Sequence, residues 1–314
     1  MTAENSATPD TAVAVSSDID AGDAHGGGRG IGNGTVLAAL GVTAFSLTFP
    51  ATAWGLEGFG PWSLVSVRSA LAALIAGTAL FALRVPLPAR RHRMGLAVVA
   101  AGVVLGFPML TTLALQTSST SHAAVVVGLL PLTTAAFSAL RTGSRPSRAF
   151  WLAALGGAGI VIAFTLQQSG GALSKADLYL FGALLVCAAG YTEGGRLARE
   201  MPGWHVIGWA LVLCLPLTLP AAAVTLAVEP VQLTAHSIVG LLWVAIGSQF
   251  LGLVVWYRGM ARIGVAKASQ LQLAQPLLTL LWSVLLLGEH LSPAAPLAAV
   301  GVLISIAVTQ RART

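Results

Sequence analysis

Ten apolar runs, separated by short polar connections, follow one another along the chain after residue 33. Most of them continue unbroken for about 18–22 residues, which is the length that an α-helix needs to cross a lipid bilayer. Strands of a membrane barrel would be about 9–11 residues long and would alternate strictly between apolar and polar positions. The pattern therefore predicts an all-α membrane protein with ten transmembrane helices. These helices are expected at residues 34–54, 62–83, 94–115, 121–140, 149–166, 178–195, 205–225, 237–257, 267–287 and 294–310.

The composition indicates that lipid is the solvent of this chain. Hydrophobic residues make up 56% of the 314 residues and charged residues only 9%, whereas a soluble domain carries roughly 25% charged residues. A soluble protein with so few charges could not cover its surface. The ten runs also use most of the length, so we expect no second, soluble domain.

The positive charges indicate which ends of the helices face the cytoplasm. Fourteen of the 17 Lys and Arg residues fall in alternate connections, at 84–93, 141–148, 196–199 and 258–267 and after residue 310, whereas the intervening connections hold only Lys175. Positive charges resist translocation, so this split predicts ten helices with both termini in the cytoplasm. The bias toward Arg, Ala and Gly suggests a bacterial genome, and hence the bacterial cytoplasmic (inner) membrane.

The remaining composition excludes several classes of partner. A net charge of +6 would raise the question of nucleic acid in a soluble protein, but here the basic residues punctuate apolar segments and form no continuous stripe. We therefore expect no nucleic acid as a partner. Cys187 and Cys214 lie in apolar runs and make neither a disulfide framework nor a metal site. No cofactor and no metal ion are expected.

The first 33 residues differ from the rest of the chain. They are rich in Ala, Ser, Thr, Asp and Gly and contain no apolar run. Such a segment cannot bury enough apolar surface to fold by itself, and it lacks the basic and apolar regions of a signal peptide. We expect residues 1–33 to form a disordered cytoplasmic tail.

The chain also resembles itself in two halves. Pro131 and Pro276 lie 145 residues apart, and further pairs of identical residues follow at the same offset without a gap. These pairs are Leu132 and Leu277, Thr134 and Thr279, Ser138 and Ser283, Gly143 and Gly288, and Gly156 and Gly301. We therefore expect two repeats of five helices, at residues 34–166 and 178–310. Because five is odd, the second repeat is inverted in the membrane, and inverted repeats are the usual framework for alternating access.

Several segments carry a resemblance to a known family. In the second repeat they are the small-residue loop Gly259–Ala268, Gln275-Pro276-Leu277, Gly288-Glu289-His290-Leu291 and Gly301-Val302-Leu303-Ile304. They resemble the EamA-type half of the drug/metabolite transporter superfamily, and the first repeat resembles it through Pro131-Leu132 and the segment from Gly156 to Ile162. Arg68 also stands where the family usually has an arginine. One departure is Gly143-Ser144, where the family often has Gly-Glu, so a role of that glutamate can be transferred only to Glu289.

The resemblance carries an expected function, because the family moves small organic solutes, with amino acids, other metabolites and drugs among them. It implies a secondary transporter of small metabolites such as amino acids or related solutes, and we expect an exporter. Its partners would be the small-molecule substrate, the lipid bilayer and a coupling proton. The alternatives are multidrug efflux within the same fold, or a membrane-embedded scaffold or channel without active transport. No enzyme is expected, because the chain holds neither an H-E-x-x-H motif nor a pair of intramembrane Asp residues.

Polar side chains at membrane depth are the candidates for a substrate site, since they must face water, protein or substrate. Gln272 and Gln275 share a helix face with Pro276 at i, i+3, i+4 spacing. They either line an aqueous substrate cavity between the two repeats or bond to neighbouring helices. Further candidates for the same cavity are Tyr191, Gln249 and Trp256.

Three charged side chains are candidates for gating or charge pairing. Arg68 lies roughly 10 Å inside the second helix, where it anchors an anion, pairs with Glu57 or Glu289 at the outer mouth of the cavity, or extends to the headgroups. Glu193 carries a proton or gates the site, or else it forms a local ion pair with Arg196. Glu289 contacts Arg68, or else it is a solvated loop residue.

Prolines interrupt the predicted helices in both halves, as gating elements require. A proline has no N–H with which to bond the carbonyl four residues earlier, so each one is a candidate hinge. The four candidates are Pro50, Pro108, Pro131 and Pro276.

We predict that residues 84–93 and 141–148 both face the cytoplasm, because positive charges resist translocation. In a variant whose two cysteines are replaced by alanine, single cysteines at positions 88 and 144 should react with a membrane-impermeant maleimide only after the membrane is opened. Labelling of either position in intact cells would contradict the topology.

Overall fold

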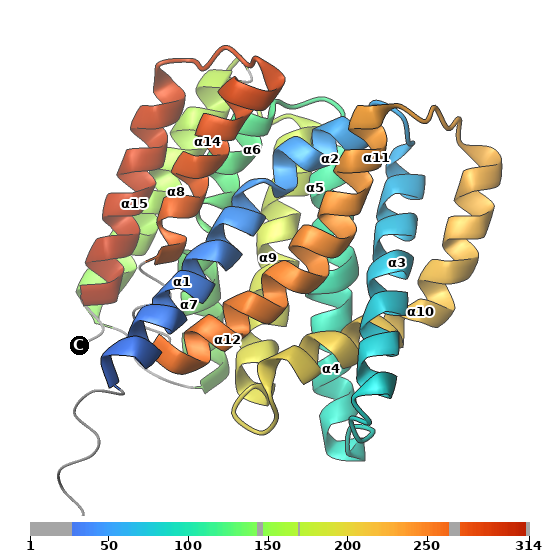
Figure 1. Ribbon diagram of the computed structural model, residues 1–314. Coiled ribbons are helices and arrows are strands. Elements are labelled where there is room, and N and C mark those ends of the chain that lie inside the picture. The colour runs from blue at the N-terminus through green and yellow to red at the C-terminus, as the bar shows by residue number, and fades with distance from the viewer. Residues whose placement is uncertain (1–26, 143–146, 169, 264–270, 312–314) are drawn as a thin grey trace, which may run out of the picture.

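The computed structural model describes residues 27–142, 147–168, 170–263 and 271–311 as a bundle of helices (Figure 1). No β-strand occurs within these four stretches. Eight helical spans in them are long and apolar enough to cross a membrane, and two shorter apolar helices follow, Ala274–Leu287 and Ala294–Val308. The chain is thus an all-α, multi-pass membrane protein.

The helices succeed one another with short connections in both halves of the chain. In the first half they are α1 (Gly27–Ser46), α2 (Thr48–Leu56), α3 (Pro61–Ala82), the 3-10 turn η1 (Arg90–His92), α4 (Arg93–Val99), the π-helical segment η2 (Ala100–Gly106), α5 (Phe107–Ala114), α6 (Thr120–Val127), α7 (Leu130–Thr142) and α8 (Arg148–Gln168). In the second half they are α9 (Lys175–Leu197), α10 (Gly203–Val228), α11 (Ala235–Leu242), the π-helical segment η3 (Trp243–Gly252), α12 (Leu253–Ile263), α14 (Ala274–Leu287) and α15 (Ala294–Arg311).

Each of the ten predicted apolar runs contains helix, and among the described residues eight spans reach the full crossing length. The run 267–287 is described from residue 271 onward, and its helix α14 begins at Ala274. At the other end, α1 begins at Gly27, inside the stretch expected to be a disordered tail. A helix that an apolar run has nucleated extends into neighbouring residues at low cost. Residues 1–26 of the predicted tail lie outside the described residues.

Several spans are interrupted along their length. The first is broken at Leu47, between α1 and α2, and the fourth is broken between α6 and α7. The third and the eighth contain the π-helical segments η2 and η3, and these two helices occupy equivalent positions in the two predicted repeats. π-helical turns are frequent at functional sites, so the interruptions mark a region of interest.

The four candidate hinge prolines lie next to these interruptions. Pro50 and Pro276 are the third residues of α2 and α14, and Pro108 and Pro131 are the second residues of α5 and α7. A proline is tolerated in the first turn of a helix because the N–H at that position has no partner within the helix. Each proline therefore starts a new helical segment in the middle of an apolar run.

Two of these prolines leave a carbonyl group that a side chain from the other half of the chain then satisfies. Pro50 cannot bond to Ser46, and Oγ1 of Thr279 lies 2.9 Å from the Ser46 carbonyl oxygen. Pro108 cannot bond to Val104, whose carbonyl oxygen accepts from Nε2 of Gln249 at 3.3 Å and also from Oγ of Ser69, in the first half, at 3.4 Å. In hydrocarbon no water can take these bonds, so side-chain donors, including donors from the other half, stabilise the interruptions.

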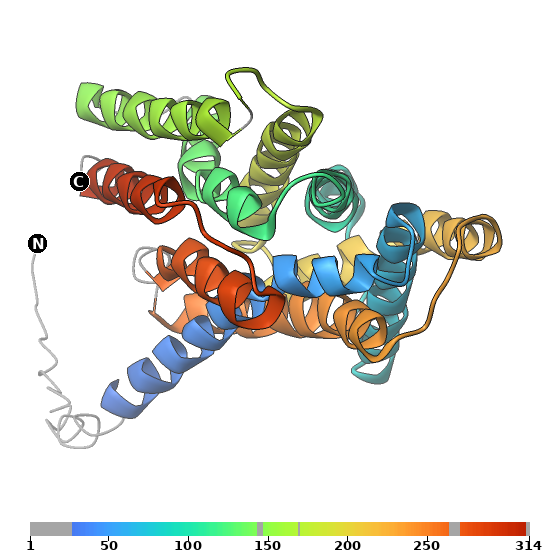
Figure 2. The same cartoon turned by 90° about the horizontal axis from the view of Figure 1, so that it is seen from above.

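The two halves are interleaved rather than set side by side. The most extensive helix contacts pair α3 with α10, α8 with α15, α1 with α12 and α5 with α9, and each pair joins one helix of either half. Seen from above (Figure 2), the α8–α15 pair lies at one edge of the bundle and the α3–α10 pair at the other. The remaining helices fill the space between these two pairs.

Glycines allow the closest of these approaches. A Cβ atom on Gly102 of η2 would lie 2.2 Å from the carbonyl oxygen of Val186 on α9. A Cβ on Gly259 of α12 would lie 2.4 Å from the backbone nitrogen of Ala38 on α1. Small residues let membrane helices approach closely enough for van der Waals packing to hold them together. The third span thus meets the sixth, and the eighth meets the first, in the same manner.

The arginine-bearing connections gather at one end of the molecule. α1 begins and α15 ends at the lower end in Figure 1, and α3, α7, α9 and α12 also end there. The basic residues at 84–93, 141, 148, 196–199, 258 and 262 therefore lie at that end, which we call the arginine-rich end. Lys175, at the start of α9, belongs to the opposite end.

The replacement Thr279→Val should lower the stability of the protein by about 1 kcal/mol, because the Ser46 carbonyl oxygen loses its donor in hydrocarbon. Thermal unfolding can be followed with a thiol-reactive dye, since both cysteines are buried. Thr165→Val is the matched control, because Thr165 is also buried but donates within its own helix, to the carbonyl of Ile162. Equal losses in the two variants would refute the role assigned to Thr279.

Candidate functional site

A central cavity lies between the two halves, beside the interrupted helices. It encloses about 590 Å³, counting the part that is open to solvent. Its wall is drawn from both halves, with residues of α1, α2, α3, η2, α5 and α7 on one side and of α9, η3, α12 and α14 on the other. The sequence-predicted residues that line it are Arg68, Tyr191, Gln249, Gln272, Gln275 and Pro108.

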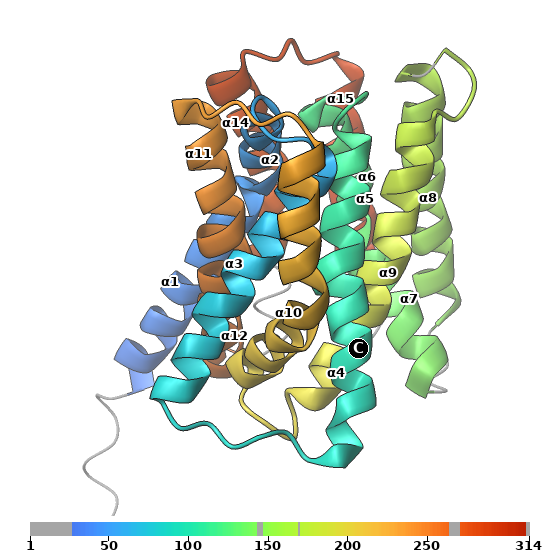
Figure 3. The same ribbon diagram turned by 90° about the vertical axis from the view of Figure 1, so that its right-hand side faces the viewer.

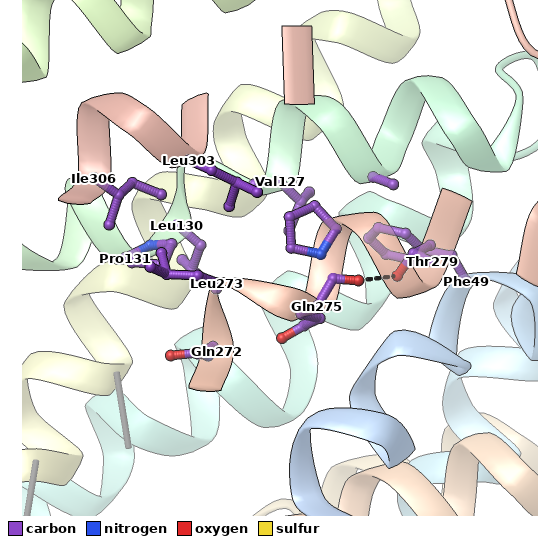
Figure 4. Close-up of a pocket in the computed structure, with 13 residues that line it drawn as sticks. Phe49, Val127, Leu130, Pro131, Gln272, Leu273, Gln275, Thr279, Leu303 and Ile306 are labelled. Atoms are coloured by element: carbon purple, nitrogen blue, oxygen red, sulfur yellow. Dashed lines mark hydrogen bonds between the residues drawn. The ribbon is translucent and has the colours of Figure 1, made fainter. Parts of the chain in front are cut away.

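The amides of Gln272 and Gln275 also line a smaller cavity next to the central one. It encloses about 410 Å³, and its lining includes Pro131 and Pro276. Figure 4 shows Pro131 and the two glutamines in this wall. Within the described residues neither side-chain amide forms a hydrogen bond, although both are partly buried. Of the two interpretations of these glutamines, a cavity lining agrees with the geometry better than helix bonding.

Arg68 is buried in the wall of the central cavity and is only 3% exposed. Its Nε donates to Oε1 of Gln249 at 2.9 Å, and Nη2 donates to the carbonyl of Val244 at 3.3 Å. Both acceptors are neutral. No carboxylate of the described residues lies within ion-pair distance of the guanidinium. A positive charge is thus held next to a cavity without a counter-charge, which is costly at membrane depth.

Gln249 both lines the cavity and ties helices together. Its Oε1 accepts from Arg68 on α3, and its Nε2 donates to the Val104 carbonyl in η2 at 3.3 Å. Ser69 Oγ lies 3.5 Å from the same nitrogen. The side chain therefore joins the second, third and eighth spans, and it holds the guanidinium of Arg68 in a fixed position.

Apolar and aromatic groups make up most of the remaining wall. Phe45, Phe49 and Phe107 lie around the cavity with Tyr191, while Thr48 and Ser248 contribute hydroxyl groups. Those two hydroxyls bond to each other at 2.7 Å. Small-molecule sites commonly combine apolar walls with a few polar groups that orient the ligand, and this cavity has that character.

Trp256 does not line either cavity, contrary to the sequence-based expectation. It is buried where α12 packs against α1, with its Cβ beside Gly41 and its ring edge-on to Phe45 at 6.2 Å between centroids. The glycine lets the backbone and Cβ of Trp256 approach α1 closely. Trp256 is therefore a packing residue between the first and eighth spans.

Glu289 and Glu57 are not the partners of Arg68. The carboxylate of Glu289 accepts from the backbone N–H groups of Thr120 at 2.7 Å and Ser121 at 3.0 Å, at the start of α6. The N-terminus of a helix offers free N–H groups and a partial positive charge, which explains this attraction. Glu57 instead lies 3.2 Å from Nδ1 of His236.

Glu193 belongs to an ion-pair network at the arginine-rich end. It accepts from Nε of Arg196 at 2.8 Å, as the local-pair interpretation expects, and also from Nε of Arg141 on α7 at 3.2 Å. Arg196 continues to Glu200, which bonds to His92 at 2.8 Å. The hydrogen bond from His92 lowers the pKa of Glu200.

The acidic side chains have a common role that sequence reasoning misses. The described residues hold six of them, and every one contacts the opposite half of the chain. These contacts are Glu57 with His236, Asp177 with His122, Glu193 with Arg141, Glu200 with His92, Glu229 with the backbone N–H groups of Trp62 and Ser63, and Glu289 with those of Thr120 and Ser121. Two lie at the arginine-rich end and four at the opposite end, so polar ties join the halves at both ends of the central cavity.

The His122–Asp177 contact is the most buried of these ties. Nε2 of His122 lies 2.6 Å from Oδ1 of Asp177, whose side chain is fully buried. The second oxygen of Asp177 accepts from the backbone and hydroxyl of Ser174 in a capping box at the start of α9. The Ser-x-x-Asp spacing marks the helix start, but nothing in the sequence indicates the histidine as its partner. Within the described residues no group of three potential metal ligands occurs.

The fold and the central cavity together define a helical membrane protein of the transporter class. The chain belongs to the EamA-like transporter family, because the family's sequence profile matches residues 32–166 and, a second time, residues 174–311. It is therefore a membrane transporter of the drug/metabolite superfamily, as the residue pattern of the second repeat indicates. The two matches also correspond to the two halves described above.

Relatives of known sequence and structure agree with this assignment. The chain is 40% identical to "Uncharacterized transporter YdeK" of Bacillus subtilis (strain 168) over 279 residues, which cover 89% of this chain and 97% of that protein. It is 30% identical to an "Uncharacterized transporter" of Haemophilus influenzae over 122 residues, 37% of this chain and 72% of that protein. A solved structure titled "Crystal structure of protein" has the same fold, with a TM-score of 0.60, 22% identity, and coverage of 88% of this chain and 97% of that one.

Two glutamines in the cavity wall should respond differently to replacement by leucine. Gln249→Leu should lower the thermal stability clearly, by about 2 kcal/mol, because it removes the acceptor of a buried guanidinium. Gln275→Leu should leave the stability nearly unchanged, because its amide makes no hydrogen bond within the described residues. Equal destabilisation of the two variants, measured with the same thiol-reactive dye, would show that Gln275 holds helices together instead of lining a site.

Proposed function

We propose that this protein is a secondary transporter that exports small organic metabolites carrying an acidic group, such as amino acids or related solutes. Transport proceeds by alternating access between two inverted repeats of five helices in a ten-helix membrane protein. One observation supports the substrate class above the others. Arg68 places a buried positive charge in the wall of the central cavity, and its bonding partners among the described residues are neutral.

The electrostatic argument concerns the cost of an uncompensated charge. Removing a guanidinium from water costs several kcal/mol unless an anion or a set of good acceptors compensates it. Gln249 and Val244 engage Nε and Nη2, and the remaining N–H groups can bind a carboxylate in a charge-assisted contact. A bound acid would thus supply the missing counter-charge. Gln272, Gln275 and Tyr191 would then bond to the rest of the substrate.

The contacts between the halves support alternating access. Opening the cavity at one end requires that the halves part there, and the acidic side chains hold them together at both ends by ion pairs or helix caps. Such contacts can break in water and reform, whereas packed apolar cores are not easily separated. The prolines and the π-helical segments supply positions at which the helices can bend. Glu193 and Glu289 would act here as members of opposite gates.

The orientation follows from the distribution of charge. The protein lies in a bacterial cytoplasmic membrane with its arginine-rich end in the cytoplasm. Both termini and residues 1–33 are then on the cytoplasmic side. Export then moves the substrate from the arginine-rich end to the end that holds Lys175 and Glu289. A coupling proton would drive this movement, and the titratable ties between the halves are the groups on which it can bind.

The first experiment compares the metabolites inside and outside cells with and without the protein, to identify the exported solute. Purified protein in sealed vesicles then tests transport of that solute directly. Arg68→Gln should reduce transport of an acidic substrate at least about tenfold, because one charge-assisted contact contributes roughly 1.5 kcal/mol or more. Arg148→Gln, an exposed arginine at the start of α8, is the control and should transport normally.

Three outcomes would overturn the proposal. Full transport by the Arg68→Gln variant would show that Arg68 does not bind the acidic group of the substrate. A transported solute without any acidic group, confirmed in vesicles, would contradict the substrate class. Absence of transport for every solute that accumulates in cells would favour a scaffold or channel.

A further inference from the structure

A separate cavity opens at the arginine-rich end of the molecule. It lies where α9 packs against α4 and α7. Figure 3 shows α4 and α7 at the lower end of the bundle. It encloses about 890 Å³, counting the part open to solvent, and shares no lining residue with the central cavity. We call it the α4–α7 groove. Arg68 and the glutamines do not line the groove, so the substrate site does not account for it, although Glu193 of its lining belongs to the proposed gate.

The groove combines two kinds of surface. Met94 and Val98 of α4, with Phe137 of α7, provide apolar walls, and Met94 is 77% exposed. Arg91, Arg141 and Arg196 come from three different elements and line the same space. In a chain that spans a membrane, an exposed apolar side chain faces lipid tails, and arginines at a helix end lie at headgroup level. The groove therefore matches a molecule with an acidic head and an apolar tail.

Part of the arginine surface remains available for a ligand. Glu193, the one acidic residue of the lining, is held between Nε of Arg141 and Nε of Arg196. Arg141 uses only its Nε in the described contacts, and its side chain is 66% exposed. Arg91 donates from its Nε to His92, the same nitrogen lies 3.9 Å from Oε2 of Glu200, and the Arg91 side chain is 76% exposed. The terminal nitrogens of both guanidinium groups thus remain as donors.

We propose that the α4–α7 groove binds an anionic phospholipid, with its phosphate on Arg91 and Arg141 and one acyl chain along Met94, Val98 and Phe137. Guanidinium groups bind phosphate in paired, charge-assisted hydrogen bonds. Basic pockets between transmembrane helices on the cytoplasmic side are suited to anionic lipid headgroups. The three arginines of the lining exceed the two carboxylates that contact them, Glu193 of the lining and Glu200 beside it. The remaining positive charge distinguishes an anionic lipid from a zwitterionic one.

The test uses the full-length protein in a neutral detergent and native mass spectrometry with phosphatidylglycerol or phosphatidylcholine of the same chain length. Phosphatidylglycerol should bind the unaltered protein at least about tenfold more tightly. The double variant Arg91→Gln, Arg141→Gln should lose most of that preference, because each arginine near the headgroups strengthens binding of an anionic lipid about fivefold. Arg258→Gln removes an exposed arginine at the same end that lies outside the groove, and it should keep the preference.

Glutamine at these exposed positions leaves Glu193 paired with Arg196, and thermal unfolding of each variant checks that it is folded. Equal binding of the two lipids, or an equal loss in the Arg258→Gln variant, would overturn the proposal. Inorganic phosphate that displaced phosphatidylglycerol at millimolar concentration would also overturn it, because the apolar walls would then contribute nothing. The measurement requires no transport, so its failure and a failure of the proposed function are distinguishable.

Discussion

The structure depends on one requirement, which is that every backbone polar group at membrane depth finds a partner inside the protein. A continuous helix meets this requirement by itself, but Pro50 and Pro108 each remove one helical hydrogen bond. The carbonyls of Ser46 and Val104 are then satisfied by Thr279 and Gln249, both from the second half of the chain. Contacts with the other half therefore help to stabilise each of these interruptions. The central cavity forms between the halves at these contacts, and Gln249 serves the backbone of η2 and the guanidinium of Arg68 together.

The acidic side chains also form contacts between the two halves. The described part of the chain holds few carboxylates, and each of them joins the two halves instead of stabilising its own helix alone. Some accept from helix N-termini, where free N–H groups and the helix dipole favour a negative charge. Others pair with Arg or His at the ends of the bundle, where water can reach them when the halves part. Apolar packing holds the middle of the bundle, and polar ties that can be exchanged for water hold its ends.

The sequence predicts the fold well because the bilayer imposes simple rules. Unbroken apolar runs give the helices, and the spacing of arginines places the connections that the structure gathers at one end. Part of the site is predictable for the same reason, since a polar residue such as Arg68, Gln249 or Gln275 at membrane depth must face protein or a cavity. The prediction that Trp256 lines the cavity fails because the sequence does not show against which neighbouring helix an apolar side chain packs. The partner of Glu289 is not predicted because the helix N-terminus that it caps lies 169 residues away, and nothing in the sequence around Glu289 indicates that contact.

The interleaving of the halves has a consequence for how the protein is made. Synthesis delivers α3, α5 and α8 to the membrane before α10, α9 and α15 exist, so these helices wait in lipid without their main partners. Five of the six acidic residues described here lie in the second half, and most of the groups they neutralise or cap lie in the first. The first half of the chain is thus a set of helices with an excess of basic groups until the second half is made. These helices can reach their final packing only after the second half has entered the membrane.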